Sequence, residues 1–100
     1  MGAHEFAALH LAEALRLVPG DLQTELQLGR ALVGMKEPEE ALSHLSRAAR
    51  TLSTGEAHEA YADALARLGR KDEARAELKA ALSAEPGRES AKKRLEGLGD

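Results

Sequence analysis

Apolar residues recur at helical spacing along the whole chain, and glycine, proline and serine divide them into six segments. Leucine and alanine return every three or four residues within each segment, as expected when one face of a helix is buried. The breaks fall near residues 19–21, 36–37, 53–54, 69–71 and 86–87. We therefore predict helices over about residues 3–18, 22–35, 38–52, 55–68, 72–85 and 88–98.

Residues that favour strands are scarce, which makes the chain all-α. There is no isoleucine, and valine and threonine together occur at only five positions. Alanine, leucine, arginine and glutamate, all good helix formers, dominate instead. The breaks leave only short loops, so neighbouring helices are expected to run antiparallel.

The chain repeats itself at a spacing of 33 or 34 residues. Ala7, Ala41 and Ala74 occupy one recurring position. The same offsets relate Leu11 to Leu45 and Leu78, and Ala14 to Ala48 and Ala81. In the preceding segments, Ala31-Leu32 returns as Ala64-Leu65. A period of this length, over a pair of helices, predicts a stack of helical hairpins.

This pattern resembles the tetratricopeptide repeat. Leu28-Gly29 and the turn at residues 69–74 fit that family's motif, although Glu25 and His58 stand at its tryptophan position. The resemblance implies one domain over residues 1–100, folded as a right-handed α-solenoid of about six antiparallel helices. It divides into the second helix of a partial repeat (3–18), full repeats at 22–54 and 55–88, and a capping helix at 88–98. An unrelated up-and-down helical bundle is the alternative architecture.

The repeat begins out of phase, with a second helix whose first-helix partner is not in the chain. A terminal unit normally has a polar outer face, yet this segment carries Phe6, Leu9, Leu11, Leu15 and Val18. Either an upstream helix has been removed, or this apolar face forms a homodimer. At the other end, residues 92–94 are basic and suit a solvated cap.

In proteins of the family that the chain resembles, the first helices line a concave groove that holds a peptide. The matching positions in this chain are mostly polar. They are Gln23, Gln27, Arg30, Glu56, Glu59, Asp63, Arg67, Lys93 and Arg94. A solvated surface without a ligand is the alternative for these positions. The lysine–asparagine clamp for acidic tails is absent, because Leu26, Arg30 and Ala60 take its places, whereas Glu56, Glu59 and Asp63 favour a basic or polar partner.

Composition excludes several other functions. The net charge is −3, which argues against nucleic acid. There is no cysteine, and the four histidines form no metal-binding pattern, so we expect no metal, cofactor or catalytic activity. No apolar run is long enough to span a membrane, and the cytoplasm is the expected location. The high arginine and alanine content favours a bacterial source. We therefore predict a protein–protein interaction module, or alternatively an element that assembles copies of itself.

Overall fold

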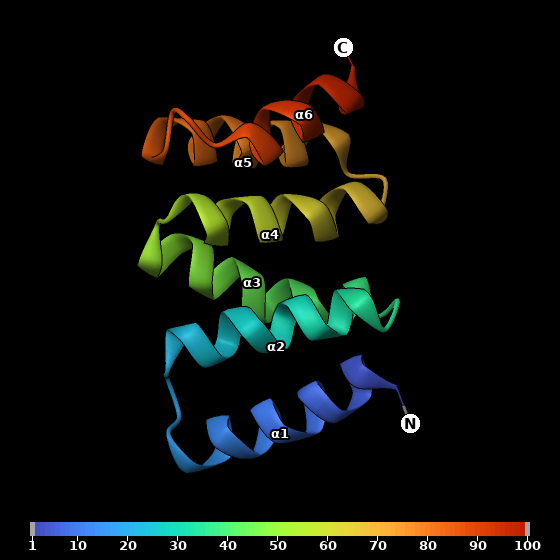
Figure 1. Cartoon of the computed structure of the whole chain (residues 1–100), viewed down its shortest axis with the longest axis vertical. Coiled ribbons are helices and arrows are strands. Elements are labelled where there is room, and N and C mark those ends of the chain that lie inside the picture. The colour runs from blue at the N-terminus through green and yellow to red at the C-terminus, as the bar shows by residue number, and fades with distance from the viewer. Residues whose placement is uncertain (1, 100) are drawn as a thin grey trace.

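The computed structural model describes residues 2–99, and its secondary structure over these residues is entirely helical. The helices are α1 (Ala3–Leu17), α2 (Leu22–Gly34), α3 (Pro38–Leu52), α4 (Gly55–Arg67), α5 (Lys71–Ala84) and α6 (Glu89–Leu98). They lie across the long axis of a body that measures 40 × 25 × 19 Å (Figure 1). The predicted helices therefore form, with ends that differ by at most one residue.

Each helix packs against its neighbours in the sequence, so the helices form an open stack rather than a closed bundle. The α2 helix also contacts α4, which places these two first helices side by side (Figure 1). The predicted all-α solenoid of helical hairpins is thus confirmed. The ends of the predicted 1–100 domain, residues 1 and 100, lie outside the described residues.

Side chains and turns fix where the helices begin and end. Asp21 caps α2 by accepting hydrogen bonds from the backbone N–H groups of Gln23 and Thr24. Thr54 caps α4 by accepting one from Ala57 at 3.1 Å. Ser53 ends α3 in the left-handed conformation, with a φ of 53°, and so redirects the chain into α4.

Small residues in the recurring positions let the helices approach closely. Ala41, Leu45 and Ala48 of α3 are all 0% exposed, and their equivalents in α5 are at most 2% exposed. Gly29 of α2 lies directly against Leu45, because a Cβ atom built on Gly29 would be 2.5 Å from the Leu45 side chain. The helices of a hairpin therefore pack around alanine and glycine, and leucine fills the remaining space.

A histidine–carboxylate pair joins the two helices of each full hairpin. In the first hairpin His44 Nδ1 lies 2.6 Å from Glu25 Oε2, and in the second His58 Nδ1 lies 2.8 Å from Glu77 Oε1. The offset of 33 residues makes Glu25 equivalent to His58 and His44 equivalent to Glu77. The two hairpins thus keep the same cross-helix pair with its two residues exchanged.

The structure corrects the predicted apolar face of α1. Leu11 and Leu15 are partly buried and pack against the core that α2 helps to form. Phe6 and Leu9 are exposed on the other side of the helix together with Leu17, and Val18 is exposed just beyond the end of the helix. The prediction grouped the residues by their apolar character, but the helical period of 3.6 residues separates them into two faces.

The contact at Gly29 predicts an unusual response to alanine. Gly29→Ala is expected to lower the free energy of unfolding by about 1–3 kcal/mol through overpacking against Leu45. A gain of about 1 kcal/mol in helix propensity offsets part of this loss, so Gly29→Ala should be less stable than an alanine substitution at an open helical glycine. Urea denaturation followed by circular dichroism measures the change. Gly97→Ala in α6 is the matched control, because a Cβ atom there meets nothing within 4 Å. A Gly29→Ala protein as stable as the control would contradict the close approach of α2 and α3.

Candidate functional site

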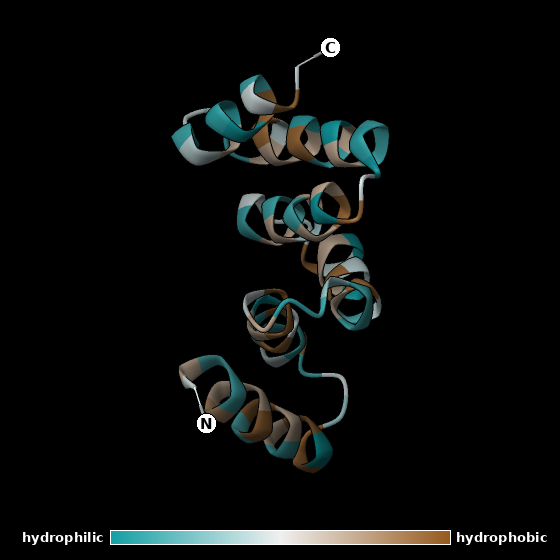
Figure 2. Cartoon of the chain, turned by 90° about the vertical axis from the view of Figure 1, so that its right-hand side faces the viewer, coloured by the Kyte–Doolittle hydropathy of each residue, from teal (hydrophilic) through white to brown (hydrophobic). Residues whose placement is uncertain are grey.

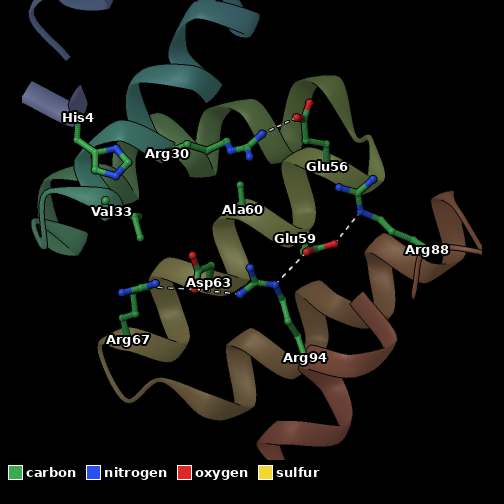
Figure 3. Close-up of a pocket in the computed structure, with 11 residues that line it drawn as sticks. His4, Arg30, Val33, Glu56, Glu59, Ala60, Asp63, Arg67, Arg88 and Arg94 are labelled. Carbon is green, nitrogen blue, oxygen red and sulfur yellow. Dashed lines mark hydrogen bonds and ion pairs between the residues drawn. The ribbon is translucent and has the colours of Figure 1, made fainter. Parts of the chain in front are cut away.

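A hollow of about 320 Å³ lies over α4, between α2 and α6 (Figure 3). Its walls are mainly charged, and four of the lining residues are arginines. The lining residues are His4, Arg30, Val33, Gly34, Glu56, Glu59, Ala60, Asp63, Arg67, Arg88 and Arg94. We refer to this hollow as the α4 pocket.

Glu59 is a buried carboxylate at the wall of the α4 pocket. It is 7% exposed and accepts hydrogen bonds from Arg88 Nε at 2.7 Å, Ser90 Oγ at 2.8 Å and Arg94 Nε at 2.9 Å. Burial by itself raises the pKa of Glu59, but the bonds from Ser90, Arg88 and Arg94 outweigh it, so the pKa lies below the ordinary value of 4.5. The ionised carboxylate therefore holds the start of α6 against α4.

The other two carboxylates of the α4 pocket are also paired with arginines. Arg30 donates from its guanidinium to Glu56 at 2.6 Å and thereby links α2 to α4. Asp63 accepts from Arg67 within α4 and from Arg94 of α6, each at 3.1 Å. The dashed lines in Figure 3 trace these pairs. Pairing to arginine leaves no free acidic patch, so the predicted preference for a basic partner loses its basis.

Comparison with known proteins identifies the architecture. Residues 55–95 match the model of the family described as tetratricopeptide repeat. This part of the chain is therefore similar to a tetratricopeptide repeat. No curated protein matches the chain in a sequence comparison.

The matched residues contain most of the α4 pocket. The match begins at Gly55, at the start of α4, and ends within α6. Tetratricopeptide repeats generally mediate protein–protein interactions and are non-catalytic. The site is therefore built on an architecture that generally serves recognition.

Six of the nine predicted groove residues line the α4 pocket. Those six are Arg30, Glu56, Glu59, Asp63, Arg67 and Arg94. Gln23, Gln27 and Lys93 lie outside its lining. The two glutamines precede the part of α2 that reaches the pocket, and Lys93 points away because consecutive helical residues face directions about 100° apart.

Five lining residues are not among the nine predicted groove residues, and three of them are His4, Val33 and Arg88. Arg88 precedes α6 and reaches back to Glu59, whereas His4 and Val33 approach from α1 and α2 (Figure 3). Arg88 lies in the turn between α5 and α6, where helical periodicity gives no guide to direction. The one available signal was Glu59 itself, because an acidic residue on a predicted inner face needs a cationic partner nearby.

Two further findings concern other kinds of site. Within residues 2–99, no group of three or more histidine, aspartate or glutamate side chains is arranged to hold a metal ion. None of the helices in this part of the chain combines the length and apolar character needed to cross a lipid bilayer.

The buried carboxylate predicts an acid-dependent contribution to stability. Glu59→Gln is expected to lower the free energy of unfolding by about 1–3 kcal/mol at neutral pH, because Arg88 and Arg94 lose their charged partner. Since the pKa of Glu59 in the folded protein lies below 4.5, its stabilising effect is complete above that pH. The effect is lost as the pH falls through the lowered folded value.

Urea titrations over a series of pH values check this prediction. The gap between the parent and Glu59→Gln proteins should narrow below pH 4.5. Glu40→Gln, at an exposed position of α3, is the control and should follow the parent at each pH. A gap that stays constant into the acid range would mean that the carboxylate of Glu59 does not hold α6.

Proposed function

We propose that the chain is a protein–protein interaction module that holds a peptide segment of its partner in the α4 pocket. The observation that carries this proposal is the pocket itself, a hollow of about 320 Å³ on the repeat, walled by residues of α2, α4 and α6. A hollow at the lower end of the usual range for binding pockets, about 300–1,000 Å³, suits one or two side chains of a bound segment.

The ion pairs around the pocket support a preformed site. Glu59, Glu56 and Asp63 are each bonded to an arginine from another helix. Because these pairs fix the pocket walls before a partner arrives, binding does not have to order them, which reduces its entropic cost.

The arginines at the rim indicate what the partner offers. The side chains of Arg30 and Arg67 are about half exposed, at 51% and 52%. Each uses one of its five N–H groups on a carboxylate of α4. Both residues line the α4 pocket, and their remaining donors suit the carbonyl and side-chain oxygens of an extended or helical segment. The bound segment is therefore expected to present hydrogen-bond acceptors to Arg30 and Arg67.

Selection from a library of displayed random peptides tests the proposal. Peptides selected on the parent protein are expected to bind the double variant Arg30→Ala/Arg67→Ala at least about tenfold more weakly, since lost charged hydrogen bonds cost about 1.5–3 kcal/mol each. Glu59 is left intact in this test because it holds α6.

Lys79→Ala is the matched control. Lys79 is an exposed basic residue of α5 outside the α4 pocket, so its loss should leave the affinity of the peptides unchanged. Isothermal titration calorimetry with the selected peptides measures all three proteins. Equal affinity for the parent and the double variant would show that the α4 pocket is not the binding site.

A further inference from the structure

The exposed large apolar side chains of the described residues gather on one helix. Phe6, Leu9 and Leu17 of α1 are 63%, 60% and 65% exposed, and Val18, which ends the helix, is 57% exposed. Figure 2 shows apolar colour along α1, at the free end of the stack. Since α1 contributes only His4 to the α4 pocket, this surface is separate from the site proposed above.

Comparison of the repeats shows that, within the described residues, α1 is covered on one side only. Ala7, Leu11 and Ala14 are equivalent to Ala41, Leu45 and Ala48, which α2 covers completely. The α5 helix is covered by α4 in the same way. In α1, however, Ala7 and Leu11 are only partly buried and Ala14 is exposed. The face of α1 therefore has the small-residue pattern that receives a helix elsewhere in the chain.

The last helix of another copy is a poor occupant for this face. The α6 helix is a first helix without a second, so it could in principle continue the stack onto α1. Its position equivalent to Gly29 and Ala62, however, holds Glu96. At Gly29 even an added Cβ would meet Leu45 at 2.5 Å. A glutamate side chain there prevents the close approach that Leu11, the equivalent of Leu45, would need.

We propose that α1 uses a separate exposed stripe, which carries Phe6 and Leu17, to pack antiparallel against α1 of a second copy of this chain across a twofold axis. Phe6, His10, Glu13 and Leu17 follow one another at steps of three or four residues and form one stripe. An axis that passes between residues 11 and 12 places Phe6 opposite Leu17 of the other copy, and His10 opposite Glu13. The surface is therefore complementary to itself, as a twofold interface requires.

The polar residues in this stripe can form the same histidine–glutamate pair that the chain forms elsewhere. Histidine meets glutamate between α2 and α3 and again between α4 and α5. His10 is equivalent to His44, one of the histidines that make these pairs. In the dimer it meets Glu13 of the second copy, and the pair forms twice. Glu13 is exposed and bonded to Arg16 within α1, so its carboxylate is accessible to a second donor.

Sedimentation at a series of concentrations tests the dimer. The mass is expected to rise from 10.7 kDa to twice that value as the concentration increases. Phe6→Glu and Leu17→Glu should each weaken the dimer at least tenfold, and circular dichroism should show that both keep their helices, because these side chains are exposed in the single chain. Lys79→Glu on α5 is the control. A monomer up to the millimolar range, or Phe6→Glu and Leu17→Glu proteins that associate as well as the control, would overturn the proposal.

Disulfide trapping tests the antiparallel register. The chain has no cysteine, so single cysteines can be introduced without competing thiols. Under mild oxidation, a mixture of Phe6→Cys and Leu17→Cys chains should form linked dimers. Each variant alone should not, because its two cysteines would lie about 16 Å apart along the helix axes. Equal linking of either variant alone, or no linking in the mixture, would overturn the register.

Discussion

The helices of this protein lie so close together that only alanine and glycine fit where they approach most closely. The chain has two aromatic residues, Phe6 and Tyr61, and Phe6 is exposed, so aromatic side chains contribute little to the core. Burial depends instead on leucines set against small residues, as Leu45 is set against Gly29. With such a core, a single hairpin cannot bury both sides of its two helices. Each helix needs a neighbour on either side, and that need explains why the helices stack.

The same spacing creates the α4 pocket. Because α2 and α4 lie side by side and α6 follows α5, polar residues of three helices meet over α4. Glu59 then decides how α6 is placed, since its carboxylate gathers Arg88, Ser90 and Arg94. Burying a carboxylate is costly unless several donors compensate for the lost water, and these donors come from the turn and helix that close the pocket. Stability and the shape of the candidate site thus depend on one side chain.

The sequence predicted the features that follow from local periodicity. Regular spacing determines the helix positions, the recurring alanines such as Ala41 and Ala74, and the solenoid architecture. A single sequence shows this spacing because the pattern recurs along the chain. The pairing of Glu59 with Arg88 could not be predicted in this way. It depends on the direction of the chain between α5 and α6, which hydrophobic spacing does not encode. The same limit applies to α1, where Leu11 and Phe6 are both apolar residues but lie on different faces of the helix.

Hydrogen–deuterium exchange at two protein concentrations tests the central claim, that α1 is incompletely covered within the described stack. In dilute protein, the amides of α1 should exchange faster than those of α2 to α5, whose faces are covered on both sides. At high concentration, protection should rise in α1 and leave α2 to α5 unchanged. Equal protection of all these helices in dilute protein, with no dependence on concentration, would contradict the account.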